Sequence, residues 1–243
     1  MSRCNANGPQ PDGFRQIVCK SYAEAAARAA TVAAGRRSAS CTPHSGLGCG
    51  SPTVFANFSP GERVLDLGSG AGFDCLAAAV EVGRRGRVVG VDMTPEMVRL
   101  ARRHAAGAGV GTVDFLQAEI ESLPFPDASF DVVMSNCVIN LCADKTRVLA
   151  EAWRVLAPGG RLVVADIVAV APLPERILGD LALHTGCVAG ATPCETLVRT
   201  LTAAGFTSIA IDVGGDGAQP IDAWAPHLEL SRFIAAASIT ARK

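Results

Sequence analysis

Apolar and polar positions alternate along this chain in a way that is typical of strands and helices that follow one another. Short apolar runs predict five strands, at Val64–Leu67, Arg87–Val91, Val113–Gln117, Phe130–Ser135 and Arg161–Val170. Longer segments with helical spacing separate most of these runs, at Phe73–Val82, Pro95–Ala106 and Asp144–Leu156. This alternation predicts a doubly wound α/β sheet whose strands are mostly parallel.

The C-terminal part of the chain is expected to complete that sheet. Two apolar segments fit a final antiparallel pair, Thr207–Val213 and Arg232–Thr240, which brings the predicted number of strands to seven. Helices are predicted at Pro174–His184 and from Thr192 or Pro193 to Ala204.

The N-terminal part differs in composition from the rest. Met1–Gly13 is expected to lack regular structure, and Gln16–Ala34 is predicted to be a helix. Arg36–Pro60 is rich in Gly, Pro and Ser, which is typical of a loop or lid. We therefore divide the chain into an N-terminal helix and lid (1–60), a Rossmann-like core (61–170) and a C-terminal substrate-binding portion with the closing strands (171–243).

A glycine loop, Gly68–Gly72, joins the first predicted strand to its helix. Glycines at such a turn let a ligand approach the backbone, and the helix N-terminus behind them favours polar ligand groups. Asp66 precedes the loop, and Asp92 ends the next strand, where a carboxylate can bind ribose hydroxyls. The negative charge of Asp66 would repel a phosphate group but would attract a cationic ligand. The stretch resembles the cofactor half of class I methyltransferases that use S-adenosylmethionine (SAM).

The remaining cofactor contacts are expected at the carboxyl ends of the neighbouring strands. Met93 and Ile120 are placed to sandwich the adenine, although both also fit a plain core position. Glu119 or a nearby backbone group is expected to bind the adenine amino group. The complete predicted SAM set is Asp66, Gly68, Ser69, Gly70, Asp92, Met93, Glu119, Ile120 and Asn136.

The composition argues against several classes of function. The formal net charge is −1, which gives no electrostatic case for binding nucleic acid or an anionic membrane. No apolar segment fits a signal peptide or a membrane helix, because Pro and Gly break the longest uncharged run. We expect a soluble, cytoplasmic monomer that acts on a small molecule.

Nine cysteines stand out against this ordinary composition. Their odd number and the lack of a C-x-x-C pair argue against a zinc ribbon and a full disulfide framework. Scattered cysteines in a reducing compartment are by default small buried apolar residues. Cys137 follows the fourth predicted strand, where SAM would present its methyl group, so its thiol is either a buried spacer or a soft ligand for the substrate.

Three cysteine-containing stretches resemble arsenite methyltransferases closely. They are Gly46–Pro52 before the core, Ser135–Leu141 followed by Asp144-Lys145, and His184–Gly190 after the core. The resemblance implies that Cys49, Cys137 and Cys187 hold arsenic(III), and that Cys41 is a redox partner that forms a disulfide with Cys49. It also implies SAM as methyl donor, glutathione or thioredoxin as thiol reductant, and thiol conjugates of arsenite and methylated arsenite as substrates.

The implied chemistry agrees with the residues. Trivalent arsenic is soft and prefers thiolate ligands, and its methylation needs no general base, which fits a chain with few His and Tyr residues. One departure from the family concerns Cys41, which stands next to Thr42, whereas many bacterial relatives carry adjacent cysteines there. Cys19 or Cys4 are therefore alternative redox partners.

Two other functions remain open. A C- or O-methyltransferase of the quinone or sterol type would share the fold, would need a base near Asn136 and would tolerate loss of the cysteines. A metalloid-binding or sensing protein with an inactive cofactor site would fail to bind SAM, although the presence of Asp66, Gly68, Gly70 and Asp92 argues against it.

Overall fold

The structure is a computed structural model, and it describes residues 11–34, 50–180, 183, 187–214 and 221–243. Its helices are α1 (Pro11–Ala34), α2 (Pro52–Phe55), α3 (Phe73–Val82), α4 (Pro95–Ala108), α5 (Lys145–Val155), α6 (Glu175–Leu178) and α8 (Cys194–Ala203). Its strands are β1 (Arg63–Leu67), β2 (Arg87–Asp92), β3 (Val113–Gln117), β4 (Phe130–Asn136), β5 (Leu156–Ala169), β6 (Thr192–Pro193), β7 (Thr207–Val213) and β8 (Ile234–Arg242). Short 3₁₀ turns follow β4 and precede β8: η1 (Ile139–Leu141), η2 (Ile221–Ala223), η3 (Pro226–Leu228) and η4 (Leu230–Arg232).

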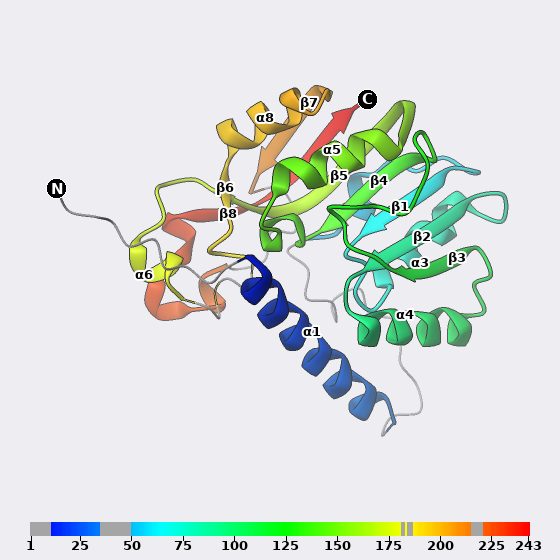
Figure 1. Cartoon of the computed structure of the whole chain (residues 1–243), viewed down its shortest axis with the longest axis horizontal. Coiled ribbons are helices and arrows are strands. Elements are labelled where there is room, and N and C mark those ends of the chain that lie inside the picture. The colour runs from blue at the N-terminus through cyan, green and yellow to red at the C-terminus, as the bar shows by residue number, and fades with distance from the viewer. Residues whose placement is uncertain (1–10, 35–49, 181–182, 184–186, 215–220) are drawn as a thin grey trace.

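One twisted sheet organises the molecule (Figure 1). Its strand order is β3-β2-β1-β4-β5-β8-β7, and β6 pairs with β5 outside this path. Strands β1 to β5 run parallel to one another, whereas β8 pairs antiparallel with β5 and with β7. The predicted mixed sheet with a closing antiparallel pair is thus confirmed, and the short β6 raises the strand count to eight.

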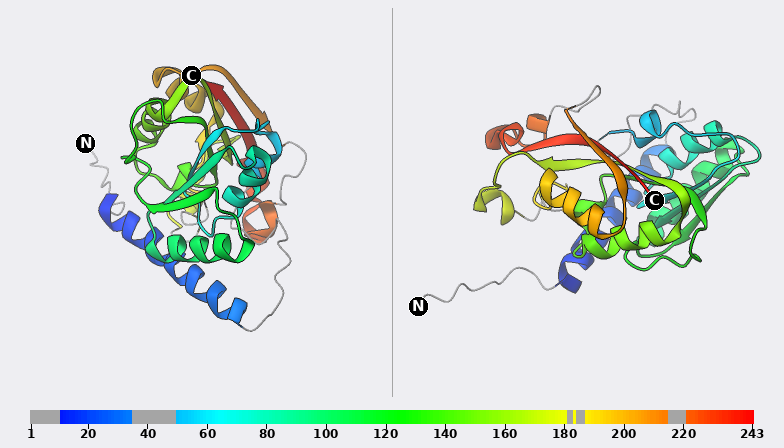
Figure 2. Two further views of the ribbon diagram at one scale, coloured as in Figure 1. Left: turned by 90° about the vertical axis from the view of Figure 1, so that its right-hand side faces the viewer. Right: turned by 90° about the horizontal axis from the view of Figure 1, so that it is seen from above.

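Alternate residues of the inner strands serve two separate cores. Val64, Val88 and Val132 pack in one cluster with buried residues of α3 and α4. Leu65 and Val133 point to the opposite face, where they pack with residues of α5 and α8. The view from above in Figure 2 places these helices on the two sides of the sheet. Apolar strands covered on both faces are what parallel sheets require.

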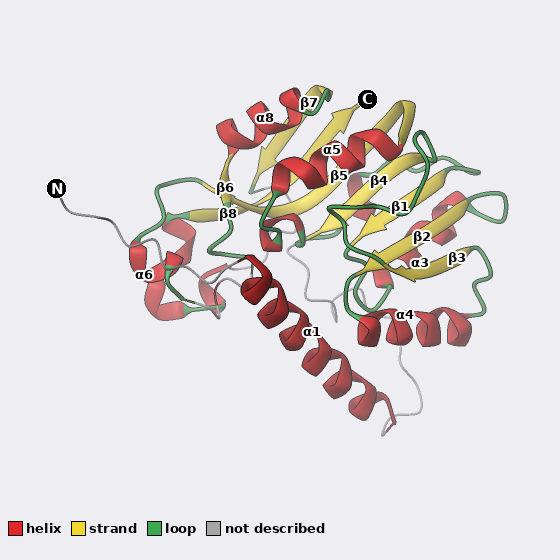
Figure 3. Cartoon of the chain, viewed as in Figure 1, coloured by secondary structure: helices red, strands yellow, loops and turns green. Residues whose placement is uncertain are grey.

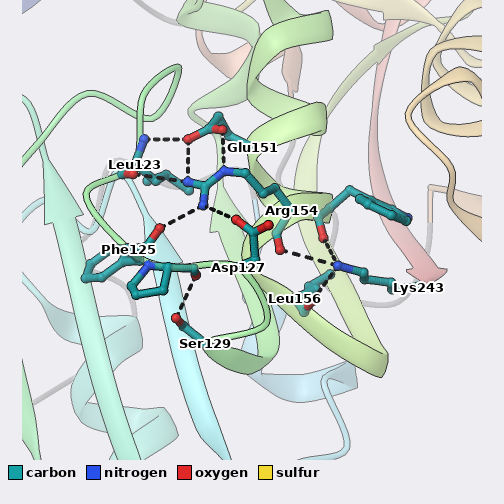
Figure 4. Close-up of polar contacts among 10 residues, drawn as sticks. Leu123, Phe125, Asp127, Ser129, Glu151, Arg154, Leu156 and Lys243 are labelled. Carbon is teal, nitrogen blue, oxygen red and sulfur yellow. Dashed lines mark hydrogen bonds and ion pairs between the residues drawn. The ribbon is translucent and has the colours of Figure 1, made fainter.

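A half-buried arginine, Arg154, fixes the connection between β3 and β4. Arg154 donates hydrogen bonds to the carbonyl oxygens of Leu123 and Phe125 and pairs with Glu151 and Asp127 (Figure 4). The Lys243 ammonium, at the end of the chain, donates to three carbonyl oxygens around the junction of α5 and β5. These bonds tie the loop after Ile120 and the C-terminus to α5.

Two local predictions were wrong, and two others hold only in part. A helix already begins at Pro11, inside the segment expected to lack structure. Of the helix predicted for 174–184, α6 ends at Leu178, where the Gly179 N–H donates to the Glu175 carbonyl. Leu183 is helical again, and residues 181, 182 and 184 lie outside the described residues. Residues 158–160, expected to lie between α5 and the fifth strand, are part of β5, where the register with β4 shifts. The sequence also predicts that Thr94 caps the helix that starts at Pro95; Thr94 does occupy the cap position of α4, but its side chain makes no capping hydrogen bond.

Candidate functional site at the carboxyl ends of the strands

The glycine loop is held by the strands on either side of it. The Ser69 N–H donates to the Val91 carbonyl at 2.9 Å, and the Asp92 carboxylate accepts from the N–H of Gly70 at 3.0 Å and of Thr94 at 2.8 Å. Asp92 therefore closes the turn between β1 and α3 onto the end of β2. It is buried, as a carboxylate that faces an enclosed ligand would be.

Gly68 allows the loop to pass close to the segment after β4. Its φ of +70° lies in the left-handed region, and an added Cβ would lie 2.4 Å from a Val138 methyl carbon. A side chain at this position would thus meet both backbone strain and a steric clash. Because Val138 follows Cys137 directly, this contact brings the glycine loop against the cysteine-bearing turn.

Three acidic groups lie beside the glycine loop. Burial is the main reason why the pKa of Asp66 rises to about 8, and the charges of Asp74 and Asp92 add to it. Burial also raises the pKa values of Asp74 and Asp92. The thiol of Cys75, on α3, donates to Asp66 at 3.2 Å. Buried acids that repel one another favour a cationic ligand, whose charge would stabilise their ionised forms.

Two polar atoms near the loop have no partner within the described residues. They are Ser69 Oγ and Asn136 Oδ1, both buried. The Asn136 amide nitrogen, in contrast, donates to Asp74 at 2.8 Å and to the Gly50 carbonyl at 2.9 Å. Buried orphan acceptors and hydroxyls are costly unless a ligand bonds them, so the loop fits a polar cofactor such as SAM.

The predicted adenine contacts are placed unequally. Ile120 is buried and packs in the core on the α5 side, while Met93 is half-buried and its carbonyl accepts from the Gln117 side chain at 3.2 Å. Glu119 is exposed. Met93 follows the last residue of β2, and Ile120 lies three residues after the end of β3, so both lie at the carboxyl ends of strands, where the sequence predicted them.

Cys137 and Cys187 meet on the other side of Asn136. The Cys187 thiol donates to the Cys137 carbonyl at 2.7 Å, and both side chains are buried. Both residues adopt left-handed backbone conformations, with φ of 55° and 66°. Such a conformation costs about 1–2 kcal/mol in a residue that carries a Cβ, and residues held in it cluster at functional sites.

A third ligating group, Asp166, was missed by the sequence analysis. Its carboxylate and the sulfurs of Cys137 and Cys187 all lie within 4.8 Å of one another. The carboxylate accepts from the Asn140 amide nitrogen at 2.9 Å and from the Ile167 N–H at 2.8 Å. Burial raises its pKa to about 6. The only sequence signal was an acidic residue within the apolar run that forms β5.

Lys145 holds the segment that carries Cys187. Its ammonium donates to the Gly190 carbonyl and, at 2.8 Å, to the Thr192 hydroxyl. Gly190 in turn lies so close to Asn140 that an added Cβ would be 2.1 Å from the Asn140 carbonyl oxygen. The Lys145 hydrogen bonds and the close approach of Gly190 to Asn140 thus hold the segment before β6, which carries Cys187, against the turn after β4, which carries Cys137.

Tyr22 on α1 links the two halves of the site. This helix packs on α4, where Tyr22 lies near Ala26, Met97 and Leu100. Burial raises the pKa of the phenol, and the charges of Cys187, Asp92 and Asp166 raise it further. Figure 3 shows α1 crossing below the sheet toward this region. The sequence had placed Tyr22 only on the packing face of a helix.

The remaining predicted cysteines are distributed differently. Cys41 and Cys49, like the alternative redox partner Cys4, lie outside the described residues. Cys137 is in a disulfide, whereas Cys19, Cys75, Cys187 and Cys194 have free thiols. Burial, followed by the charge of Asp166, raises the pKa of Cys187. Within the described residues the structure brings together two of the three predicted arsenic ligands.

Comparison with known proteins agrees with this geometry. A family model described as a methyltransferase domain matches residues 58–219. An arsenite methyltransferase of Halobacterium salinarum is 48% identical over 82% of this chain and 51% of its own length. The arsenite methyltransferase of Aquipseudomonas alcaligenes is 42% identical over 66% of this chain and 48% of its own length. The chain thus spans about half the length of these curated relatives.

A solved structure shares the architecture. The arsenic(III) S-adenosylmethionine methyltransferase of Chlamydomonas reinhardtii is 36% identical, with a TM-score of 0.61 over 81% of this chain and 66% of that one. The fold is therefore that of class I SAM-dependent methyltransferases. None of the helices in the described part of the chain has the length and apolarity to cross a membrane.

Proposed function

The chain belongs to the methyltransferase-domain family, and we propose that it is an arsenite methyltransferase that transfers methyl groups from SAM to thiolate-bound trivalent arsenic. One observation carries the proposal. Two buried cysteines in left-handed conformations, Cys137 and Cys187, lie together next to Asn136, which borders the glycine loop. The similarity to arsenite methyltransferases supports arsenic as the substrate.

The residues around the glycine loop are assigned to SAM by charge and position. Burial disfavours the ionised form of Asp66, so the positive charge of the ligand would stabilise its carboxylate. Asp92 is assigned to the ribose hydroxyls, and Ser69 and Asn136 supply the polar atoms that lack partners within the described residues. Gly68, Gly70, Met93, Glu119 and Ile120 complete the proposed cofactor site.

The protein's part in the reaction is to position the substrate. SAM supplies an electrophilic methyl group, which the arsenic lone pair attacks as the sulfonium becomes a neutral thioether. Cys137 and Cys187, with Cys49 as the third thiolate, hold arsenic so that this lone pair lies in line with the methyl group. No proton leaves the acceptor, so the chain needs no base at this point.

Formation of the As–C bond formally oxidises arsenic to the pentavalent state. We assign its return to the trivalent state to two thiols, Cys41 and Cys49, which would give up two electrons and form a disulfide. Glutathione or thioredoxin would then reduce that disulfide. The substrates are small thiol conjugates of arsenite and methylated arsenite, and we expect a monomer that binds neither nucleic acid nor membrane.

One assay tests this proposal. Purified protein is incubated with SAM, arsenite and glutathione, and the arsenic species are separated by chromatography. We expect methylated arsenicals that depend on SAM and on the thiol. Turnover of a quinone or sterol substrate with no methylation of arsenic would instead support a C- or O-methyltransferase, and arsenic binding without SAM binding would support a metalloid-binding protein.

A further inference from the structure

The cluster of Cys137, Cys187 and Asp166 contains a carboxylate donor that the binding of arsenic by thiolates does not require. Trivalent arsenic prefers soft sulfur ligands, and the proposed function already assigns it three thiolates. A carboxylate is a hard donor. The carboxylate lies within 4.8 Å of both sulfurs, so the three donors form a mixed sulfur and oxygen set. Such a set prefers different ions from those that a purely thiolate set prefers.

The Asp166 carboxylate is oriented for an additional ligand. One oxygen, Oδ1, accepts from the Asn140 amide nitrogen and the Ile167 N–H at 2.9 and 2.8 Å. The other, Oδ2, has only a long contact of 3.4 Å from the Asn140 N–H. The salt bridges within the described residues do not include Asp166. A buried carboxylate in this situation gains from a bound cation.

The spacing of the three donors is close to that of a metal site. Sulfur ligands lie about 2.3 Å from Zn²⁺ and carboxylate oxygens about 2.0–2.2 Å, so two donors of a tetrahedral ion are roughly 3.6–3.8 Å apart. The donor atoms of the cluster, which are all within 4.8 Å of one another, would move closer by up to roughly 1 Å when the ion binds. Three protein ligands leave a fourth position for water or an external thiol.

The surrounding charges suit a divalent ion. Two thiolates and one carboxylate carry three negative charges, which a divalent cation reduces to one. Lys145 supplies a nearby positive charge, and its ammonium is directed to the Gly190 carbonyl and the Thr192 hydroxyl. Among the described residues, the other titratable groups near the cluster are Cys142 and Tyr22, and neither carries a positive charge.

We propose that Cys137, Cys187 and Asp166 form a site for a thiophilic divalent cation with a filled d shell, Zn²⁺ or Cd²⁺, in the reduced protein. Occupation of this site excludes arsenic, because both would use the same two sulfurs. The competition rests on the proposed function, whereas cation binding itself does not. The disulfide at Cys137 must first be reduced, which makes the site dependent on the same thiols that support methylation.

The test is a titration of the full chain with Cd²⁺ after reduction with a phosphine and removal of the phosphine. The ultraviolet thiolate-to-cadmium charge-transfer band reports binding. Asp166→Asn is nearly isosteric, and its amide oxygen can still accept from Asn140 and Ile167. Asp212→Asn is the matched control, since Asp212 is exposed on β7. We expect Asp166→Asn to weaken cadmium binding at least about tenfold relative to arsenite binding, and the control to change neither.

Three results separate the possible outcomes. Equal loss of cadmium and arsenite affinity in Asp166→Asn, or no loss of either, would overturn the proposal. Cys187→Ser should weaken both ligands, and unchanged cadmium binding in that variant would overturn it too. If wild-type protein binds cadmium through Asp166 but does not methylate arsenite in the presence of SAM and glutathione, the proposed function fails while the cation site stands.

Discussion

The two halves of the candidate site lie side by side but are built in opposite ways. The glycine loop places positive φ values on glycines, including Gly68 and Gly70, and backbone N–H groups tie it to Asp92 and Val91. The cysteine cluster places positive φ values on Cys137 and Cys187, where a Cβ makes them costly. Glycine gives the first half its shape with little strain, whereas the second half retains strain to bring two sulfurs together.

This difference follows from what each ligand needs. SAM is recognised through charge, hydroxyls and backbone approach, which regular strand ends and a helix N-terminus provide. Arsenic is recognised by side-chain sulfur alone, so the backbone must adopt the conformation that aims each sulfur. Variants of the two halves should therefore lose different properties, the cysteine variants arsenic methylation and the cofactor-site variants SAM binding, and five predictions test this.

The largest effect is expected in the cysteine cluster. Cys137→Ser and Cys187→Ser should each reduce methylation of arsenite and of a monomethyl arsenical at least about 100-fold, since misplacement of a reacting group alone can cost this much. Steady-state rates measured with both substrates check this, and SAM affinity measured by calorimetry should remain unchanged. Full activity of Cys137→Ser would rule out arsenic as the substrate of this cluster.

A companion variant probes the third thiolate. Cys49→Ser should abolish methylation of arsenite but leave that of the monomethyl arsenical, which needs only two protein sulfurs, and Cys41→Ser should behave alike if it is the disulfide partner. Equal loss on both substrates in Cys49→Ser would argue against three thiolates.

The cofactor half should show the next largest effect. Asp92→Ala should weaken SAM binding by about 1–3 kcal/mol, because ribose hydroxyls would lose a charged acceptor. Calorimetry measures this, and Asp92→Asn, which keeps an acceptor for the Gly70 and Thr94 N–H groups, separates ligand contact from loop geometry. Unchanged affinity in both variants would remove Asp92 from the proposed site.

A pH-dependent effect is expected from Asp66. Its pKa rises from 3.8 to about 8 in the folded protein, so the stability that it contributes is fully present below pH 3.8 and is lost as the pH rises through 8. The free energy of unfolding without SAM should therefore fall between about pH 5 and 8, by up to about 1.4 kcal/mol per pH unit from this group. Urea denaturation of Asp66→Asn should show a flatter profile, and an identical profile would contradict the assignment.

The smallest effects are expected at cysteines outside the cluster. Cys142 and Cys194 are half-buried and pack against the main core. Cys142→Ser and Cys194→Ser should leave arsenic methylation near the wild-type rate and lower the free energy of unfolding by about 1 kcal/mol, since each places a hydroxyl in an apolar contact. Loss of methylation in a folded variant of either kind would mean that the arsenic ligands are misassigned.

The sequence predicted where Asp66, the glycine loop and Asp92 lie in the fold, because these signals are local, while their role in binding SAM stays a prediction. Asp66, the glycine loop and Asp92 occur at the ends of apolar runs, and the sheet brings those ends together. The alternation of strands and helices along the chain also predicted the mostly parallel sheet. The failures are local too: Gly179 ends α6 early, and Thr192 pairs with Val168 in the short strand β6, so that of the two predicted helix starts only Pro193, the N-cap of α8, fits.

The cysteine half could be predicted only through the family resemblance. Neither the apolar pattern nor the spacing indicates that Cys187 returns to Cys137 from 50 residues away. Helix α5 and strand β5 intervene, and within the described residues only the short helix α6 lies between β5 and Cys187 as a guide to the path of the chain. Asp166 is hidden in an apolar strand, and its role depends on which side chains oppose it in three dimensions. Contacts of this kind are set by tertiary packing, not by local pattern.

The most direct test of the account is the sulfur coordination of bound arsenic. X-ray absorption at the arsenic edge, on reduced protein loaded with one equivalent of arsenite, counts the sulfur neighbours. We predict arsenic bound to sulfur alone in the wild-type protein, and one sulfur fewer with an oxygen in its place in Cys187→Ser. An oxygen-bound arsenic in the wild-type protein, or an unchanged sulfur shell in Cys187→Ser, would contradict the account.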